Sequence, residues 1–390
     1  MKACFVVSTY EPDTIGGQGE VALKLQKNLQ ELSVETYVFT SGSHVNGYHR
    51  TIRTGCGKRL FYPVSAAHVN WFRKMDFDII NVHQESGLSI VPILAASKCR
   101  TKIVTTLHTS YLSESRALGR LAGFRTQLTA PVFDEYVVKY LLTPLKFFGT
   151  YLDCAVSDKI VAVCTNTKRE CRVDYGIPEE KISVIHNGVS LTEFNPDVDR
   201  TKVRIKHSLK DDPVILSVGC GTIRKGIPYL LRSMVDVKAA FPNARLIVVG
   251  GTKYRNRLMA LSRDLGVHEN VIFPGMVPRK DLPFYYSACD IVAVPSLQEG
   301  FPVVVLEALA SGKPVVGSCV GGIPEAIEAG KNGILVQPGN INYLRRALIL
   351  LLEDDDLRRR MGRYARLVAE REFDWKEIAH RYIAEFEKLL

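Results

Sequence analysis

The feature that most constrains the fold is an alternation of short apolar runs with longer amphipathic stretches in both halves of the chain. Runs of the first kind predict strands, and a period near 3.6 residues between them predicts helices. In the first half the predicted strands are residues 3–8, 35–39, 77–83, 102–108, 159–164 and 182–185. In the second half they are residues 214–218, 246–249, 271–273, 291–294, 315–317 and 333–336. Because strands separated by helices form parallel sheets, the sequence predicts two doubly wound, Rossmann-like α/β units.

A polar stretch between the two halves contains Pro196 and Pro213 as breakers of regular structure. We therefore predict an N-terminal Rossmann-like domain at residues 1–195 and a C-terminal one at residues 196–374. A last predicted helix, residues 375–390, ends the chain. A chain of 390 residues that is 46% hydrophobic is long enough to bury two cores.

Composition limits the kinds of protein that this chain can be. It has no apolar run near 18 residues, which predicts no membrane span, and its N-terminus shows no secretion signal. The nine cysteines are scattered without a C-x-x-C pair, which indicates reduced thiols in a cytoplasmic protein and no zinc site. The net charge of +10 suits phosphorylated substrates or an anionic membrane face, but a generally basic solvated surface would have the same charge, so these interpretations stay open. No nucleic-acid-binding module is recognisable, so no nucleic-acid partner is predicted.

Two segments, residues 44–75 and 113–151, mix basic and aromatic side chains and fit the alternation poorly. This composition suits the headgroup layer of a membrane. Ordinary helices that cover a core would have the same composition, so both interpretations stay open. The second segment is the better candidate for acceptor recognition or peripheral membrane contact.

Glu299 and Glu307 frame the most informative motif. Glu299 lies in a Gly/Pro turn after a predicted strand, and Glu307 lies inside an apolar, helix-forming run. Pro302 suits the first turn of that helix. Unpaired backbone N–H groups at the helix start favour a phosphate, and open α/β sheets bind ligands at the carboxyl ends of their strands. The motif therefore predicts a phosphate site flanked by two acids that can hold hydroxyls, as a nucleotide sugar requires.

Other candidate residues also follow predicted strands. Gly16 and Gly17 lie between a strand and a helix, where a missing Cβ lets the backbone approach a ligand. Arg224 and Lys225 follow the first strand of the second half and can neutralise a leaving diphosphate. His108 stands at the end of a predicted strand.

Taken in order, these motifs resemble the retaining glycosyltransferases of family 4, which have the GT-B fold of two Rossmann-like domains facing each other across a cleft. The resemblance implies that the domain at residues 1–195 binds the acceptor and that the domain at residues 196–374 binds the nucleotide-sugar donor. It also implies that the helix at residues 375–390 packs back on the first domain. Six motifs carry the resemblance: Gly16-Gly17, His108, residues 185–189, residues 218–226, the pair Glu299 and Glu307, and residues 321–325.

The resemblance implies a role for each motif. Glu299 would hold donor-sugar hydroxyls, Glu307 the ribose hydroxyls, and His108 would lie near the sugar 6-position. The predicted catalytic residues are therefore Glu299, His108 and Lys225. The predicted donor-binding residues are Gly16, Gly17, Arg224, Lys225, Glu299, Gly300, Phe301, Pro302, Val303, Val304 and Glu307. Supporting positions are Asn187 and Gly188, and Glu325 borders the nucleotide without a chemical role.

One departure from the family pattern concerns the cations. The family commonly has Gly-Arg-Leu followed by a Lys five residues after the Arg. Here Cys220 and Gly221 occupy the Arg and Leu positions, while Lys225 keeps its place. Arg224 either substitutes for the missing Arg or points to solvent.

The implied activity is a retaining hexosyltransferase that moves a sugar from a nucleotide-sugar donor to a glycolipid, lipid-linked or polysaccharide acceptor. Asp76-Phe-Asp78 has the D-x-D spacing of a possible metal motif, but its position predicts the start of a strand. No cofactor and no metal are therefore expected. A rise of about 1.5 Å per helical residue puts Glu299 and Glu307 roughly 10 Å apart, too far for the carboxylate pair of a retaining glycosidase at about 5–5.5 Å.

Alternatives remain at this point. A nucleotide-sugar epimerase or hydrolase would share the fold. A non-catalytic nucleotide-sugar-binding protein would explain the missing Arg at position 220. A nicotinamide oxidoreductase is more distant, because neither half has a G-x-G-x-x-G loop with its acidic residue.

Overall fold

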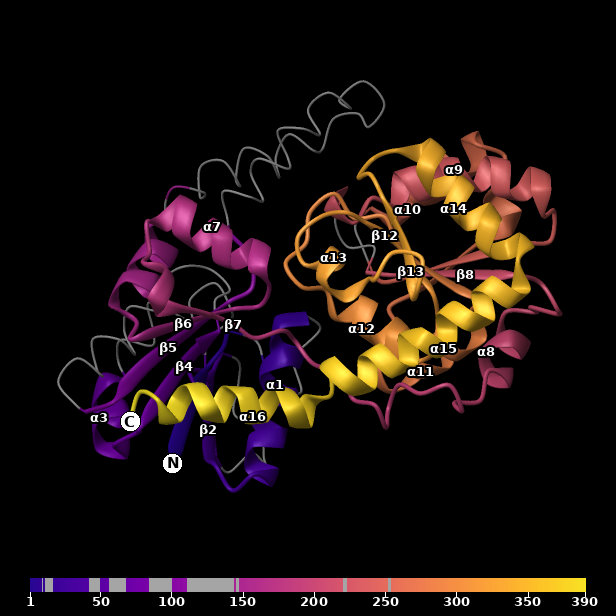
Figure 1. Ribbon diagram of the computed structural model, residues 1–390. Coiled ribbons are helices and arrows are strands. Elements are labelled where there is room, and N and C mark those ends of the chain that lie inside the picture. The colour runs from indigo at the N-terminus through magenta and orange to yellow at the C-terminus, as the bar shows by residue number, and fades with distance from the viewer. Residues whose placement is uncertain are drawn as a thin grey trace. The chain divides into compact units, whose positions relative to one another are not determined.

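The computed structural model describes residues 1–8, 10, 17–41, 50–55, 68–83, 100–110, 144, 147–219, 223–251 and 254–390. The chain forms two compact units (Figure 1). Unit 1 comprises Met1–Asn187 and Trp375–Leu390, and unit 2 comprises Gly188–Asp374. The division therefore falls before the predicted boundary at residue 195. The reason is that residues 188–195 pack on unit 2, where the ring of Phe194 meets that of Tyr286 edge-on at 5.5 Å.

Unit 1 contains a parallel sheet of seven strands in the order β3-β2-β1-β4-β5-β6-β7. The strands are β1 Lys2–Val6, β2 Glu35–Thr40, β3 Thr51–Arg53, β4 Ile79–His83, β5 Lys102–Leu107, β6 Lys159–Ala162 and β7 Ile182–Val184. The helices with described bounds are α1 Gly17–Glu31, α3 Val69–Met75, α7 Thr165–Tyr175 and α16 Trp375–Glu387. Every strand predicted in this half is present. The prediction missed β3, a three-residue edge strand in the segment 44–75, because its half-exposed residues show no apolar run.

Unit 2 contains a parallel sheet of six strands in the order β10-β9-β8-β11-β12-β13. The strands are β8 Val214–Val218, β9 Arg245–Val249, β10 Val271–Gly275, β11 Ile291–Val294, β12 Val315–Ser318 and β13 Gly333–Val336. The helices are α8 Thr201–Lys206, α9 Ile227–Ala240, α10 Arg255–Asp264, α11 Leu282–Ala288, α12 Val303–Ala310, α13 Ile323–Ala326, α14 Ile341–Glu353 and α15 Asp355–Glu372. All six predicted strands are confirmed.

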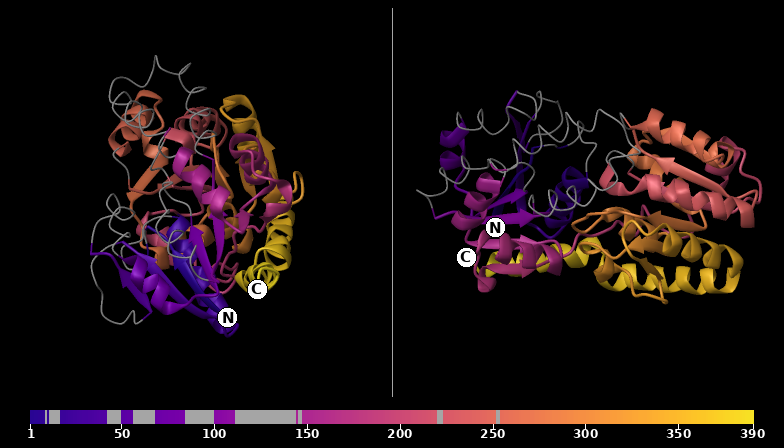
Figure 2. Two further views of the ribbon diagram at one scale, coloured as in Figure 1. Left: turned by 90° about the vertical axis from the view of Figure 1, so that its left-hand side faces the viewer. Right: turned by 90° about the horizontal axis from the view of Figure 1, so that it is seen from above.

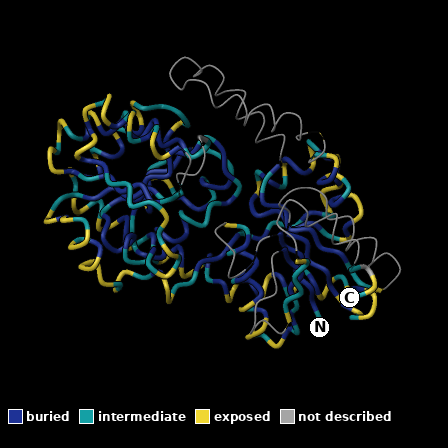
Figure 3. Tube along the Cα trace, turned by 180° about the vertical axis from the view of Figure 1, so that it is seen from behind, coloured by how far each residue is buried: buried dark blue, intermediate teal, exposed yellow. Residues whose placement is uncertain are grey.

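Helices cover both faces of the second sheet. On one face α9 packs against α10 and α14, and on the other α12 packs against α15 and α11 against α8 (Figures 1 and 2). The four central strands β9, β8, β11 and β12 are buried almost throughout, the edge strands β10 and β13 are half-buried, and exposed residues lie on the outer sides of the helices (Figure 3). Burial on both faces explains why these strands read as continuous apolar runs.

The strand order of each sheet changes direction once. In unit 1 the chain proceeds from β1 to β2 and β3 on one side and then continues with β4 on the other side of β1. In unit 2 the same change occurs between β8 and β11. The loops that leave the carboxyl ends of two such neighbouring strands diverge, and the crevice at this switch point is where open α/β sheets bind ligands.

The C-terminal helix α16 belongs to unit 1 and contacts α1. Tyr382 of α16 lies 3.4 Å from the hydroxyl of Thr106 on β5, and Glu385 accepts a hydrogen bond from Ser183 on β7 at 2.8 Å. The chain passes between the units twice, and the two passages are paired by a bridge between Val189 and Asp374. Among the helices that the structure describes, none has the length and apolarity to cross a membrane.

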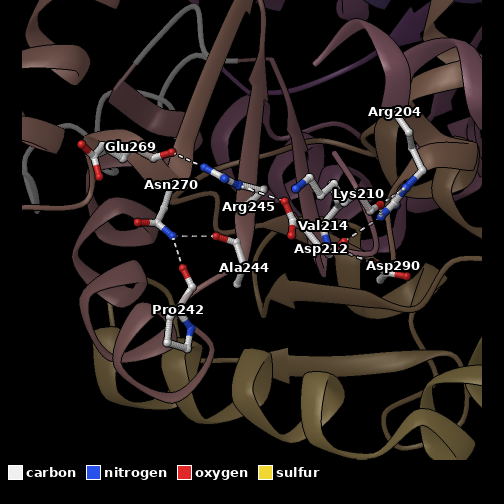
Figure 4. A network of polar contacts seen from close by, with 10 residues as sticks. All are labelled: Arg204, Lys210, Asp212, Val214, Pro242, Ala244, Arg245, Glu269, Asn270 and Asp290. Atoms are coloured by element: carbon white, nitrogen blue, oxygen red, sulfur yellow. Dashed lines mark hydrogen bonds and ion pairs between the residues drawn. The ribbon is translucent and has the colours of Figure 1, made fainter. Parts of the chain in front are cut away.

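The amino ends of the second sheet are held by a separate polar network (Figure 4). The carboxylate of Asp290 accepts the backbone N–H of Val214 at 2.8 Å, and Asp212 accepts from Arg245 at 3.2 Å. The amide of Asn270 donates to two backbone carbonyls, both at 2.9 Å. These charged residues, including the acidic stretch before Pro213, therefore stabilise the strand starts, at the edge opposite the switch-point loops.

Candidate active site

Two loops meet at the switch point of unit 2. The loop after β8 ends in a 3₁₀ turn, Ile223–Lys225, and the loop after β11 leads to α12. The backbone N–H of Leu297 donates to the carbonyl of Arg224 at 2.7 Å. Gly226 has φ +69°, and a Cβ there would lie 1.9 Å from the carbonyl oxygen of Pro295. Only glycine fits at this position, and the two loops are therefore held in close register.

Glu299 is the centre of the cluster that these loops build. One carboxylate oxygen, Oε1, accepts hydrogen bonds from Lys225 Nζ and Ser296 Oγ, both at 2.7 Å. The other, Oε2, lies 3.5 Å from Nη1 of Arg224. The Glu299 side chain is 5% exposed, whereas those of Lys225 and Arg224 are 19% and 32% exposed. The structure thus brings three predicted residues together and leaves the two cations accessible.

Ser296 was not predicted. It precedes Glu299 by three residues in the same loop, and its hydroxyl is buried against the carboxylate. A serine at this spacing before an acid in a turn was the available sequence signal.

The pKa of Glu299 is set by opposing effects. Burial alone would raise it, but the charges of Lys225 and then Arg224, with hydrogen bonds from Lys225 and Ser296, outweigh burial and hold the pKa below its ordinary value. Glu299 is therefore an anion that accepts hydrogen bonds at neutral pH.

Arg224 faces this cluster and does not point away from it. Its Nη1 lies 3.4 Å from the carbonyl oxygen of Gln298 in addition to its contact with Glu299. The side chain is turned toward the acid, as a substitute for a family arginine would be. Cys220 and Gly221 lie outside the described residues.

The helix after Glu299 begins one residue later than predicted. Pro302 is the N-cap of α12, with extended φ and ψ of −76° and 120°, and the first helical residue is Val303. The carbonyl of Pro302 already accepts from the N–H of Val305 at 3.1 Å, as an N-cap carbonyl does. No side chain caps α12, so no capping side chain accepts a hydrogen bond from the N–H groups of its first turn.

Gly300 and Phe301 hold the loop in place from behind. The carbonyl of Gly300 accepts the N–H of Gly322 at 2.6 Å, and the buried ring of Phe301 packs 5.7 Å from that of Phe373. Gly321 has φ +56°, and a Cβ there would lie 2.1 Å from the carbonyl oxygen of Glu299. The glycines before Glu325 therefore brace the Glu299 loop.

Glu307 is surrounded differently from the prediction. Its side chain is 1% exposed, and its two oxygens are bonded to Arg279 and, at 2.7 Å, to the hydroxyl of Tyr286. Arg279 also lies over the ring of Phe194 at 4.9 Å. Burial, and then the Glu307 charge, raise the pKa of Tyr286 well above its ordinary value. The phenol therefore stays protonated at neutral pH and remains a hydrogen-bond donor. A hydroxyl pair can reach this carboxylate only if Arg279 moves.

In unit 1, His108 follows β5 and pairs with a residue that was not predicted, His83 at the end of β4. Nδ1 of His83 and Nε2 of His108 are 3.2 Å apart. Burial lowers the pKa of His108 to about 4. Burial, and then the charge of His108, lower the pKa of His83. Both imidazoles are therefore neutral at pH 7.

The loop after His108 is anchored to α7. The hydroxyl of Ser110 donates to Asp174 at 2.7 Å, and its N–H donates to Glu170 at 3.3 Å. Of the predicted glycine pair, Gly16 lies outside the described residues and Gly17 is the first residue of α1. Asn187 is buried at the end of unit 1.

Asp76-Phe-Asp78, predicted as the start of a strand, lies directly before β4. Asp76 follows α3 with φ +49°, and Asp78 accepts the N–H of Lys2 at 2.7 Å at the start of the sheet. Within the described ranges, no group of three or more His, Cys, Asp or Glu side chains is arranged to hold a metal ion.

Two family profiles match the chain, one for each half. The profile described as Glycosyltransferase Family 4 matches residues 15–193, and the profile described as Glycosyl transferases group 1 matches residues 199–368. Together they span nearly all of the two units.

Individual proteins agree with the profiles. An uncharacterized glycosyltransferase of Methanocaldococcus jannaschii is 29% identical, over 97% of this chain and 96% of that protein. A GDP-mannose-dependent alpha-(1-6)-phosphatidylinositol monomannoside mannosyltransferase of Mycolicibacterium smegmatis is 31% identical, but over only 56% of this chain and 59% of that enzyme. The structure of Anabaena HepE in complex with UDP and glucose superposes with a TM-score of 0.80 at 22% identity, and the match covers 100% of both chains. The chain belongs to the group 1 glycosyltransferases of family 4 and has their GT-B fold.

Proposed function

We propose that this protein is a retaining hexosyltransferase that transfers a sugar from a nucleoside diphosphate sugar to an acceptor hydroxyl without a metal ion. The observation that carries the proposal is the cluster of Glu299, Lys225, Arg224 and Ser296 at the switch point of unit 2. It combines an anionic acceptor for hydroxyls with two partly exposed cations beside the start of α12. A diphosphate and a sugar need these two kinds of partner side by side.

The roles follow from charge and geometry. Lys225 and Arg224 stabilise the negative charge that develops on the leaving diphosphate, and the first N–H groups of α12 add to this field. Glu299, held as an anion, accepts hydrogen bonds from two sugar hydroxyls, each worth about 1.5–3 kcal/mol because the acceptor is charged. His108 contributes a neutral polar contact to the sugar. Glu307 receives the ribose only after Arg279 has been displaced.

The Glu299 carboxylate does not resemble a nucleophile, because three donors surround its two oxygens. We therefore propose that the departing phosphate takes the proton of the acceptor hydroxyl and that the acceptor enters on the same face, which retains the anomeric configuration. Orientation and charge stabilisation are then the protein's contributions.

For the acceptor, we propose a lipid-linked sugar at the inner face of a membrane. Support comes from the net charge of +10 and from the Mycolicibacterium relative, a phosphatidylinositol monomannoside mannosyltransferase. Of the segment 113–151, which motivated this acceptor class, only residues 144 and 147–151 are described.

The donor is identified first, by a thermal-shift screen with UDP, GDP, ADP and their sugars. A ligand present at 100 times its dissociation constant stabilises the folded protein by about 2.7 kcal/mol, which is measurable. Turnover is then followed as release of the nucleoside diphosphate, with and without phosphatidylinositol mannoside, polyprenyl-phosphate sugars or soluble glycans. The proposal expects acceptor-dependent release that persists in EDTA and a product with the anomeric configuration of the donor.

Other outcomes identify the alternatives. Free sugar or an epimer formed without acceptor would indicate a hydrolase or epimerase. Donor binding without turnover on any acceptor would indicate a binding protein. Glu299→Gln keeps the shape and removes the charge, and we expect it to lower turnover on the order of 100-fold or more. Glu353→Gln, at the exposed end of α14, is the matched control and should leave turnover unchanged.

A further inference from the structure

The pair of histidines at the carboxyl ends of β4 and β5 has a feature that the family motif does not explain. His83 is fully buried and ends β4, which neighbours β1 at the switch point of unit 1. Its Nδ1 contacts Nε2 of His108 at 3.2 Å, while its Nε2 is buried with no hydrogen-bond partner among the described residues. Among the described residues, the His83 side chain thus has one polar contact, which is the contact with His108.

The rings cannot easily reorient. The ring of His83 lies 5.8 Å from that of Phe5 on β1 and 5.4 Å from that of His108. Two residues earlier on the same two strands, the hydroxyl of Thr106 donates to Asn81 at 2.9 Å and lies 3.4 Å from the hydroxyl of Tyr382. The contact between the histidines is therefore one of two side-chain polar contacts that the described residues make between β4 and β5, and it lies nearer the carboxyl ends of these strands.

A neutral pair with this contact has two possible proton arrangements. If His108 donates from Nε2, then His83 carries its proton on Nε2, and a fully buried N–H is left without an acceptor. If His83 donates from Nδ1, only a lone pair of His83 is left unpaired. Buried N–H groups without partners are the rarer case and cost about 1–3 kcal/mol. The second arrangement is favoured, and it leaves His108 with its proton on Nδ1.

We infer that His83 is a positioning residue that holds His108 as the Nδ1–H tautomer, so that His108 meets its ligand as a hydrogen-bond donor through Nδ1. Because Nε2 of His108 is taken by His83, Nδ1 is the nitrogen left for a substrate oxygen. The catalytic part of this inference rests on the proposed function, in which His108 contacts the donor sugar. The tautomer itself does not depend on it.

The test compares His83→Asn with His83→Leu, two side chains of nearly equal size. The Asn amide N–H₂ can take the place of the Nδ1–H donor, and Leu cannot. The tautomer is read from two-bond ¹H–¹⁵N spectra of protein labelled with ¹⁵N-histidine, assigned with His108→Asn. In the wild type and in His83→Asn we expect a pyrrole-like Nδ1 on His108, and in His83→Leu a mixture or the Nε2–H form.

Turnover of the sugar donor found in the screen gives the second readout. We expect His83→Leu to lower kcat roughly tenfold, the rate equivalent of one lost hydrogen bond, with little change in KM, and His83→Asn to restore most of that loss. A pyridine-like Nδ1 on His108 in the wild type would overturn the inference even if neither variant folds. So would an unchanged tautomer in His83→Leu. The predicted tautomers in a protein that transfers no sugar would instead disprove the proposed function and leave the assignment of His83 standing.

Discussion

In unit 2 the switch point between β8 and β11 places the carboxylate of Glu299 against Lys225 and Arg224, whereas in unit 1 the ends of β4 and β5 bring His83 against His108. The acid and both imidazoles are buried, and both groups lie at the carboxyl ends of parallel strands in similar sheets. The first is charged, with its acid held ionised, and the second is neutral, because burial lowers the pKa of both imidazoles. In the described residues, the same sheet edge thus carries a charged cluster in one unit and an uncharged polar pair in the other.

Removing the positive charge of Lys225 in unit 2 should have the largest effect on turnover. Lys225→Met is expected to lower kcat on the order of 100- to 1,000-fold, because a fixed cation is lost where negative charge develops. The double variant Lys225→Met/Glu299→Gln should be less than additive, since each single change already removes the ion pair between these two residues. Steady-state kinetics on the four proteins of the cycle measure this, with the exposed Lys206→Met as control. Turnover within a few-fold of wild type for both single variants would refute the assigned roles.

The neutral histidine pair of unit 1 should affect how the stability of the protein depends on pH. Between pH 6.5 and about 4 the unfolded chain protonates His108 and the folded chain does not, so the free energy of unfolding decreases as the pH falls through this window. The contribution of His108 to this decrease amounts to about 3 kcal/mol, and His83, whose pKa is also lowered by burial, adds to the decrease. His108→Asn should remove the contribution of His108 and leave that of His83, as measured by urea unfolding at pH 7 and pH 4.5.

Glu299→Gln provides the contrasting control for that experiment. The pKa of Glu299 is lowered from 4.5, so its stabilising contribution is present above that pH and is lost only as the pH falls further. This variant should leave the slope between pH 6.5 and 5 unchanged. If Glu299→Gln flattened that slope and His108→Asn did not, the electrostatic assignment of the Glu299 cluster and the histidine pair would be reversed.

The second acid of unit 2 tests how far the charged character extends. Tyr286→Phe deletes the phenol that donates to Glu307 and leaves a buried carboxylate oxygen without that bond, at an expected cost of about 2 kcal/mol. Tyr343→Phe removes a hydroxyl from a tyrosine that is 54% exposed and should cost little. Urea midpoints of the two variants give the comparison. Equal midpoints would mean that the phenol does not support Glu307.

Replacing Arg224 should have the smallest effect on turnover. Its contact with Glu299 is 3.5 Å long, and about a third of its side chain is exposed, so solvent screens the charge interaction. We expect Arg224→Gln to lower kcat/KM only about three- to tenfold. If Arg224 substitutes for the family arginine, then Cys220→Arg in the Arg224→Gln background should restore the loss. No restoration would show that Arg224 has a role of its own in this chain.

Much of the site was readable from the chain because its signals are local. Glu299, Lys225 and His108 each follow an apolar run, and a parallel sheet gathers such positions at one edge. Their partners were harder to find. Ser296 lies three residues from Glu299 in a turn without a distinctive pattern, and β3 was missed because a three-residue edge strand has no period to detect.

The sequence by itself determined the two α/β units, their twelve principal strands and the segments that carry the candidate residues, because apolar period and turn chemistry are properties of neighbouring residues. Only the tertiary structure decided which side chains meet. Lys225 and Glu299 are 74 residues apart in the chain, and His83 and His108 are 25 apart. Glu307 is paired with Arg279 and Tyr286, two residues that the motif around Glu299 and Glu307 did not indicate. The protonation states follow from these pairings and from burial, and neither is a property of a single segment.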